Sequence, residues 1–255
     1  MDDLRFEGGA ATSLPPPPPP ATVTTVLSPD GATVVAADSI ATAYGTNLAT
    51  ATAAAPDSMH PPLSLGGTSV SVKDASGTEL PAALSYVSPT QVNFAVPAGL
   101  APGTATVKVT NGLGVVTAGT VPIANVSPGL FSADATGAGV AAASIVRVHA
   151  DGTQTFEQVA QYDAASKKFA AVPVDVSTDQ VYLVLYGTGL RHAASVAVTI
   201  GGTPATVAYA GPQLQYPGLD QVNVLVPSSL AGRGSVAVQL TADGQGANAV
   251  GISVK

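Results

Sequence analysis

Hydrophobic and polar residues alternate along most of this chain in short runs that turn signals interrupt. The clearest run is Thr104 to Thr110, where Ala105, Val107 and Val109 share one face and polar residues the other. Asn111-Gly112 follows it, and this dipeptide is a strong hairpin signal. Similar runs recur at short intervals with Gly, Pro, Asn and Asp between them. This pattern predicts an all-β chain of the sandwich type.

Short phrases occur twice along the chain in the same order. Tyr44-Gly45-Thr46-Asn47-Leu48 recurs as Tyr186-Gly187-Thr188-Gly189-Leu190. Gly66-Gly67-Thr68 recurs as Gly201-Gly202-Thr203, and Gln91-Val92-Asn93 recurs as Gln221-Val222-Asn223. A spacing of more than ~100 residues is too long for a solenoid repeat. The repeat therefore indicates two copies of one domain.

The copies divide the chain into an arm and two β-sandwich domains. Residues 1–21 form the arm, and its six consecutive prolines, Pro15 to Pro20, predict an extended polyproline II segment. The first domain covers 22–125 and the second 126–255. We expect extra strands in the second domain within 127–180, at 141–149, 154–161 and 168–172. The first domain instead has a longer loop at 49–63, and loops carry recognition more often than strands do.

Several repeated residues suit structural roles. Gly45 and Gly187 each follow an apolar strand, where glycine permits positive φ or close backbone approach. Asn93 shares a strand face with Gln91, and we expect its side chain to satisfy backbone groups at a strand or loop end, with ligand contact as the alternative. The structural motif residues are Tyr44, Gly45, Asn93, Tyr186, Gly187 and Asn223.

Charge and composition exclude several classes of partner. The chain has 9 Lys and Arg against 16 Asp and Glu, a net charge of −7, so it lacks the basic stripe that nucleic acids require. Without cysteine it has neither disulfides nor thiolate metal sites. No apolar run reaches the ~20 residues of a membrane span, so we expect no membrane insertion. The start, Met1 to Phe6, lacks the apolar core of a signal peptide, and we expect either that a signal was removed or that the chain is part of a longer secreted protein.

The sequence offers no convincing catalytic or metal site. His60, His149 and His192 are not at metal-ligand spacing, and the carboxylates are scattered. The segment from Asp74 to Glu79 contains calcium-type ligands but departs from the EF-hand pattern, so we interpret it as a turn. Lys73 and Lys108 in predicted strands suit solvated edges, with an isopeptide bond as the alternative. We expect no enzyme, no cofactor and no metal.

Longer segments resemble a known family. Ser39 to Leu48, Ser127-Pro128-Gly129-Leu130-Phe131 and Tyr216 to Pro227 resemble segments of the Solibacter-type uncharacterised C-terminal domain of large secreted acidobacterial proteins, and of the IPT/TIG class more widely. The resemblance covers residues 22–255. It implies two tandem immunoglobulin-like β-sandwich domains of the IPT/TIG type, with the polyproline arm outside the family pattern. It also implies an extracellular or cell-surface setting and no established activity.

Two functions fit these observations. The first is a structural or adhesive module of the cell surface that self-assembles into filaments by strand addition, in which one subunit's strand completes a sheet in the next. The candidate donors are the segment 4–6 and the strand Thr22, Val23, Thr24, Thr25, Val26 and Leu27. The alternative is a carbohydrate- or protein-binding accessory module of a larger secreted protein. Its candidate aromatics are Tyr44, Tyr86, Tyr162, Tyr209 and Tyr216.

Overall fold

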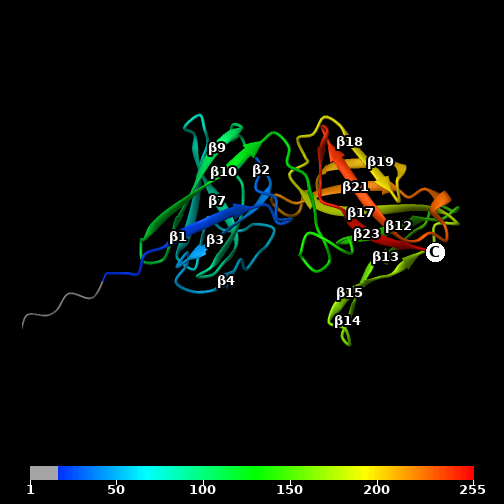
Figure 1. The fold of residues 1–255 in the computed structure, drawn as a ribbon, viewed down its shortest axis with the longest axis horizontal. Coiled ribbons are helices and arrows are strands. Elements are labelled where there is room, and N and C mark those ends of the chain that lie inside the picture. The colour runs from blue at the N-terminus through cyan, green and yellow to red at the C-terminus, as the bar shows by residue number, and fades with distance from the viewer. Residues whose placement is uncertain (1–16) are drawn as a thin grey trace, which may run out of the picture.

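The structure is a computed structural model that describes residues 17–255, and it consists of two β-sandwiches arranged end to end (Figure 1). Within those residues the helical structure is limited to one 3-10 turn, Ser228–Leu230. The fold class predicted from the alternating pattern is therefore confirmed as tandem immunoglobulin-like β-sandwiches. Pro17–Pro20 of the arm have no regular secondary structure. The remainder of the predicted arm, with the candidate donor at 4–6, lies outside the described residues.

The first sandwich is built from ten hydrogen-bonded strands, eight of which follow a single path. They are β1 (Thr22–Leu27), β2 (Val35–Ala36), β3 (Ile40–Thr46), β4 (Ala53–Ala54), β5 (Ser64–Leu65), β6 (Thr68–Lys73), β7 (Glu79–Val87), β8 (Gln91–Ala95), β9 (Gly103–Thr110) and β10 (Val116–Ala124). The order across the sheet is β1-β3-β8-β7-β6-β9-β10-β2, with β4 on β7 and β5 on β6. The predicted inward set of β9, from Ala105 to Val109, is fully buried.

The second sandwich repeats this order with additions. Its strands are β11 (Gly129–Leu130), β12 (Ala143–Val148), β13 (Gln154–Gln158), β14 (Ala160–Asp163), β15 (Lys168–Ala171), β16 (Pro173–Val174), β17 (Gln180–Thr188), β18 (Val196–Ile200), β19 (Thr203–Pro212), β20 (Asp220–Leu225), β21 (Gly234–Ala242), β22 (Gln245–Gly246) and β23 (Val250–Val254). The path is β13-β12-β17-β20-β19-β18-β21-β23-β16. The central run β17-β20-β19-β18-β21-β23 matches β3-β8-β7-β6-β9-β10.

One long strand in each domain joins the two layers of the sandwich. The first half of β7 pairs with β6 and its second half pairs with β8. The register of β7 shifts between Leu84 and Tyr86, and that of β19 shifts between Val207 and Tyr209. Such bulges bend a strand and increase its twist, which lets one strand serve both layers. Because both copies have the bulge opposite the repeated Asn, the repeat extends to the backbone.

The two domains differ at their first strand. β1 is a single strand beside β3, from the pair Thr22 and Thr46 to the pair Leu27 and Thr42, with one register shift between Val23 and Thr25. In the second domain β11 takes the first part of this position, and β12 resumes it after the loop at 131–142. β12 continues into β13, which pairs with β12 alone. The insertion therefore replaces the single strand β1 by the two strands β11 and β12, and it adds β13 as a new edge strand.

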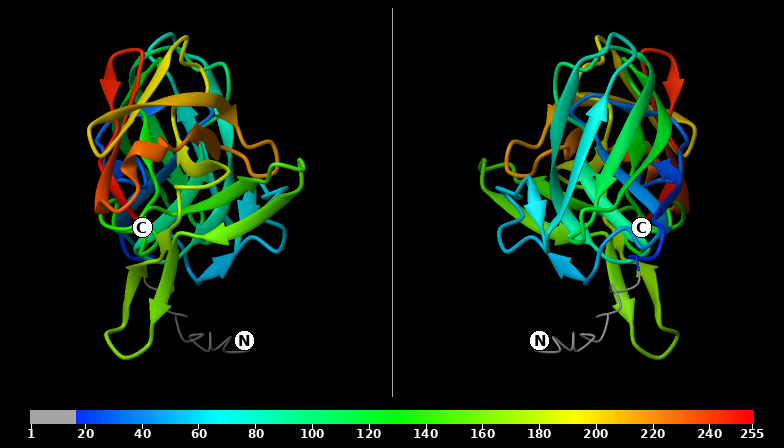
Figure 2. Two further views of the ribbon diagram at one scale, coloured as in Figure 1. Left: turned by 90° about the vertical axis from the view of Figure 1, so that its right-hand side faces the viewer. Right: turned by 90° about the vertical axis from the view of Figure 1, so that its left-hand side faces the viewer.

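One expectation for the insertion is wrong. The run at 154–161 does not form a single strand but divides into β13 and β14 at Val159. Val159 is fully buried in the core, and its carbonyl accepts the Val172 amide. This anchor turns the chain out of the main sheet. β14 and β15 then form a separate hairpin that projects from the body in both views of Figure 2.

Gly45 confirms the expected close backbone approach. A Cβ at this position would overlap the carbonyl oxygen of Thr22 on β1. Gly187 stands in the same relation to the carbonyl oxygen of Gly129 on β11. Glycine is thus required where the first strand of each domain meets the strand that carries the Tyr-Gly-Thr phrase.

Candidate functional site at the domain junction

A buried polar arrangement connects the two sandwiches where they meet. The Thr188 hydroxyl accepts the Ile40 amide at 2.8 Å and donates to the Gly218 carbonyl at 2.7 Å. Thr188 is completely buried, although the matching Thr46 of the first domain is exposed. We call Thr188 with these two backbone partners the threonine latch. It ties β3 of one domain to β17 of the other.

Further contacts support the latch. Ser127 in the connecting segment donates its hydroxyl to the Val34 carbonyl at 2.8 Å. His192 and Asp38 make an exposed contact of 3.1 Å across the junction. Gly218 has φ +79°, and a Cβ there would lie 2.9 Å from the Ser39 backbone. The junction therefore combines a buried hydrogen-bond relay with close backbone packing.

The threonine latch makes a testable prediction. Thr188→Val keeps the shape of the side chain but leaves the Ile40 amide and Gly218 carbonyl without their partner. We expect a cost of about 1–3 kcal/mol, because a buried polar group without a hydrogen-bond partner carries a desolvation penalty that nothing compensates. Urea unfolding followed separately for the two domains measures this loss. Thr46→Val, at the exposed matching position, is the control, and an equal effect of the two variants would contradict the role of the latch.

A cleft lies above the outer face of the first sheet, between the two domains. It has a volume of about 460 Å³, and its floor comes from β3, β7 and β8. Its far wall comes from β11 and the loop that follows, with Phe131 as the aromatic member. A smaller hollow of about 250 Å³ shares Ile40 and Ser85 with it and reaches Tyr216 and Pro217. We call the two together the junction cleft.

The floor of the junction cleft carries predicted motif residues. Asn93 Oδ1 accepts Gln91 Nε2 at 2.8 Å and the Thr42 hydroxyl at 3.1 Å. The partners of Asn93 Oδ1 are therefore side chains and not backbone groups, contrary to our expectation, because the Asn lies mid-sheet where the ladder satisfies the backbone. Tyr44 stands at one end of this row and is 39% exposed.

The second domain repeats this row without the cleft. Gln221 Nε2 donates to Asn223 Oδ1 at 2.8 Å, as in the first domain. Tyr186 occupies the position of Tyr44, and Val184 replaces Thr42. None of these second-domain residues lines the junction cleft. The wall formed by β11 and the loop after it faces only the row of the first domain. The sequence identified the row but not the wall.

One loop residue that the sequence did not single out holds this wall in place. Asn248 accepts the Leu130 amide at 2.7 Å and donates to the carbonyls of Leu130 and Gly137 at 2.8 and 2.6 Å. Ser132, which is buried, accepts the amides of Thr136 and Gly137 at 3.0 Å. An Asn between short strands is an ordinary turn residue, so no sequence signal marks this role.

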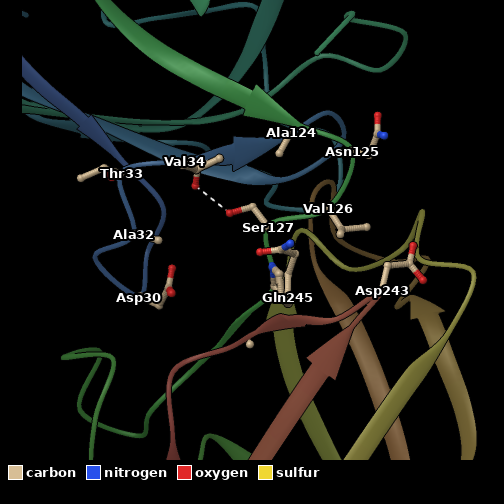
Figure 3. A pocket seen from close by; sticks show the side chains of 12 residues that line it. Asp30, Ala32, Thr33, Val34, Ala124, Asn125, Val126, Ser127, Asp243 and Gln245 are labelled. Atoms are coloured by element: carbon tan, nitrogen blue, oxygen red, sulfur yellow. Dashed lines mark hydrogen bonds between the residues drawn. The ribbon is translucent and has the colours of Figure 1, made fainter. Parts of the chain in front are cut away.

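A wider groove lies beside the connecting segment, as Figure 3 shows. It has a volume of about 740 Å³ and carries carboxylates on opposite sides, from Asp30 and Asp243. The Asp243 carboxylate already accepts the amides of Ala194 and Ser195 and the Ser195 hydroxyl. Within residues 17–255 no three His, Asp or Glu side chains gather as a metal site. The groove lies between the two domains and is lined by residues of both.

The histidines and lysines discussed above lie apart from one another. His60 contacts Asp57 at 2.8 Å, and His149 contacts Asp179 at 3.2 Å. Lys108 Nζ bonds Glu79 at 2.9 Å on an exposed sheet face. These are solvent-facing pairs, which contribute little to stability. The isopeptide alternative for Lys73 or Lys108 stays untested.

The candidate calcium turn is satisfied by its own backbone. Asp74 Oδ1 accepts the amides of Ser76 and Thr78 and the Ser76 hydroxyl, and Oδ2 accepts the Ala101 amide at 2.7 Å. These bonds, with that from Ala101 first, lower the pKa of Asp74 from 3.8 to about 2. The geometry supports the interpretation as a turn that also anchors the loop at Ala101.

This anchor predicts a pH dependence of the first domain. The folded pKa of Asp74 lies below its ordinary value of 3.8, so its stabilising effect is present above about pH 4 and is lost as pH falls towards 2. Asp74→Asn should lower the melting temperature at pH 7 and flatten its decline between pH 4 and 2. Thermal scans across this range measure both effects. The control is Asp151→Asn in an exposed turn of the second domain. Bonds from Thr153 also lower the pKa of Asp151, but it lacks a long-range bond like that from Ala101, so its effect should have the same sign and be smaller; an equal effect would contradict the anchoring role.

Comparison with known proteins leaves the family undecided. No protein-family model matches the chain, and no curated protein matches it either. The resemblance to the Solibacter-type family therefore stays a prediction. Among solved structures, titin immunoglobulin tandem domains A164-A165 match at 11% identity over 87% of this chain and 90% of theirs, with a TM-score of 0.24.

A second similar structure is a tetra-tandem repeat from the extending region of a large adhesion protein. It matches at 14% identity over 92% of this chain and 73% of its own, also with a TM-score of 0.24. At this level of superposition neither similarity bears on function. The assignment to immunoglobulin-like sandwiches rests on the strand order above. Within residues 17–255 no helix is long and apolar enough to cross a membrane.

Proposed function

We propose that this chain is a non-catalytic structural or adhesive module that carries tension between its two ends. The observation that carries the proposal is a parallel strand pair in each domain. β2 pairs parallel with β10, the last strand of the first sandwich, and β16 pairs parallel with β23, the last strand of the second. β1 and the C-terminal end lie at opposite ends of the molecule (Figure 1).

Parallel pairing decides how a sheet resists a pull. In a parallel pair, force on the early strand and force on the last strand act at opposite ends of the ladder. The bonds are then loaded in shear, all at once, and not peeled apart one by one. The threonine latch adds a tie between the domains. A two-domain rod of this kind suits a module that holds other parts of an assembly at a distance.

Single-molecule force spectroscopy tests this proposal. The chain contains no cysteine, so cysteines added at its two ends give unique attachment points. We expect two discrete unfolding events in each stretched molecule, one for each sandwich. A chain that extends smoothly, while urea unfolding shows that both domains are folded, would overturn the proposal that the module carries tension.

The proposal extends to self-assembly at a cell surface, supported by the low share of charged residues, 10%, and by two sheet edges. β1 pairs with β3 of its own domain, so its donation to another subunit requires its release. Its outer edge lies beside β10, where the Val23 amide donates to the Thr117 hydroxyl at 3.2 Å. β13, the terminal strand of the other sheet, offers an acceptor edge.

A reversible staple tests strand exchange. The hydroxyls of Thr22 and Thr46 are 2.8 Å apart across β1 and β3, so Thr22→Cys with Thr46→Cys can form a disulfide. We expect the oxidised protein to remain monomeric and the reduced protein to assemble, as light scattering would show. Assembly of the oxidised form to the same extent would rule out exchange of β1.

A further inference from the structure

The junction cleft combines an uncharged lining with aromatic and amide side chains, which distinguishes it from three further hollows within residues 17–255. One of these, beside β21 and β23, is also uncharged but has no aromatic or amide side chain. The lining of the junction cleft includes no charged residue, whereas the groove beside the connecting segment has two carboxylates and a hollow near β14 has Asp134, Lys167 and Lys168. Both ends of the cleft carry a half-exposed tyrosine, Tyr44 at 39% and Tyr216 at 42%. The larger part, about 460 Å³, is within the ~300–1,000 Å³ of common ligand sites.

The floor of the cleft presents unused hydrogen-bonding groups. Within the described residues, Gln91 Oε1 and Asn93 Nδ2 make no hydrogen bond, although the opposite atoms of both amides are engaged. The bond between the two amides fixes an acceptor and a two-proton donor side by side. Ser85, on the adjacent strand β7, is exposed, and its hydroxyl makes only a long contact of 3.4 Å to the Asn93 carbonyl. These groups are neutral and held in place.

We propose that the junction cleft binds a neutral oligosaccharide. Sugar rings offer C–H faces that pack on aromatic side chains, and hydroxyls that both donate to and accept from amides and hydroxyls. Phe131 and the two tyrosines supply the aromatic surfaces, and the pair Gln91 and Asn93 supplies a matched acceptor and donor for adjacent hydroxyls. The absence of charge in the lining disfavours an acidic or basic ligand, whose desolvation would be uncompensated.

An extended peptide fits the cleft less well. Extended peptides are commonly held by backbone pairing at a free sheet edge. The floor strands β3, β8 and β7 are each paired on both sides, so their backbone groups are engaged within the sheet. A ligand in the cleft must therefore be recognised by side chains, which is how proteins commonly bind sugars. This inference is independent of the proposed role in carrying tension, because a module can bind a glycan whether or not it resists force.

The test uses neutral hexasaccharides as probes, namely cellohexaose, xylohexaose, laminarihexaose and chitohexaose, with polygalacturonate and an unstructured peptide pool as comparisons. Titration is followed by amide shifts in ¹⁵N-labelled full-length protein. We expect at least one neutral hexasaccharide to bind and to shift residues of the junction cleft. Binding of none of them, binding of the peptide pool instead, or shifts confined elsewhere would overturn the proposal.

The duplicated row supplies matched variants. Tyr44→Ala and Gln91→Ala should each weaken binding by about tenfold or more, the size of a buried-anchor truncation. Tyr186→Ala and Gln221→Ala, at the equivalent positions of the second domain, should leave it within about twofold. Amide spectra establish that each variant is folded. Equal losses from both pairs of variants would overturn the assignment to the cleft.

Discussion

Asp220→Ala should destabilise the second domain by about 3–5 kcal/mol, because it removes one member of a buried ion pair. The Asp220 carboxylate is completely buried and accepts Arg191 Nε at 2.7 Å and the amides of Leu190 and Arg191 at 2.8 and 3.2 Å. Burial raises the pKa of Asp220, and the bonds from Leu190 and Arg191 oppose that rise. Truncation leaves a nearly buried guanidinium and two amides without their acceptor.

Chemical unfolding of the second domain measures this effect. The matched control is Thr90→Ala, since Thr90 precedes Gln91 as Asp220 precedes Gln221, and its side chain is exposed. In the first domain the Leu48 amide bonds the Pro89 carbonyl at 3.0 Å, so no side chain is needed there. The control should stay within about 0.5 kcal/mol of the unsubstituted protein. A loss below 1 kcal/mol for Asp220→Ala would show that the pair is dispensable.

Gly45→Ala should destabilise the first domain by about 3 kcal/mol, at the upper end of the range for overpacking. The added Cβ would overlap the Thr22 carbonyl oxygen, which is a backbone atom and cannot turn aside as a flexible side chain could. The expected response is that β1 separates from β3 near Thr22. Urea unfolding measures the loss, and hydrogen exchange of the β1 and β3 amides locates it.

Gly246→Ala is the control for this substitution. It also lies in a strand, and a Cβ there would meet nothing within 4 Å. We expect a change within about 0.5 kcal/mol. A similar result for Gly45→Ala, with β1 still protected from exchange, would mean that the strands can separate enough to admit a methyl group. If β1 is instead released, the variant should also speed any strand exchange between subunits.

Much of the fold could be predicted from local signals. The alternation in β9 and the turn at Asn111-Gly112 depend on neighbours in the chain, and both are present as expected, with Asn111 Oδ1 accepting the Leu113 amide at 3.0 Å. The close approach at Gly45 was also predictable, since glycine is the residue that permits it. The expected strand at 154–161 was wrong because the contact that divides it is a long-range anchor at Val159.

The candidate site was only half predictable. The row of Tyr44, Gln91 and Asn93 was identified by its repetition, but the wall opposite it comes from a loop more than thirty residues further along the chain. Asn248 holds that loop from another hundred residues away. Such contacts leave no local pattern, because each participant is an ordinary loop residue by itself.

The sequence alone determined most of the strands, the duplication, the turn residues and the lack of a basic surface, because alternation, repetition and charge are properties of the chain itself. Only the tertiary structure decided what each copy's residues do. Thr46 and Thr188 occupy the same place in the repeated phrase, yet the first is exposed and the second is buried in the latch. The difference arises because the first domain packs against the second at Thr188, whereas nothing in the described part of the chain packs against Thr46 in the same way. The same residue in the same phrase therefore has a different environment in each domain.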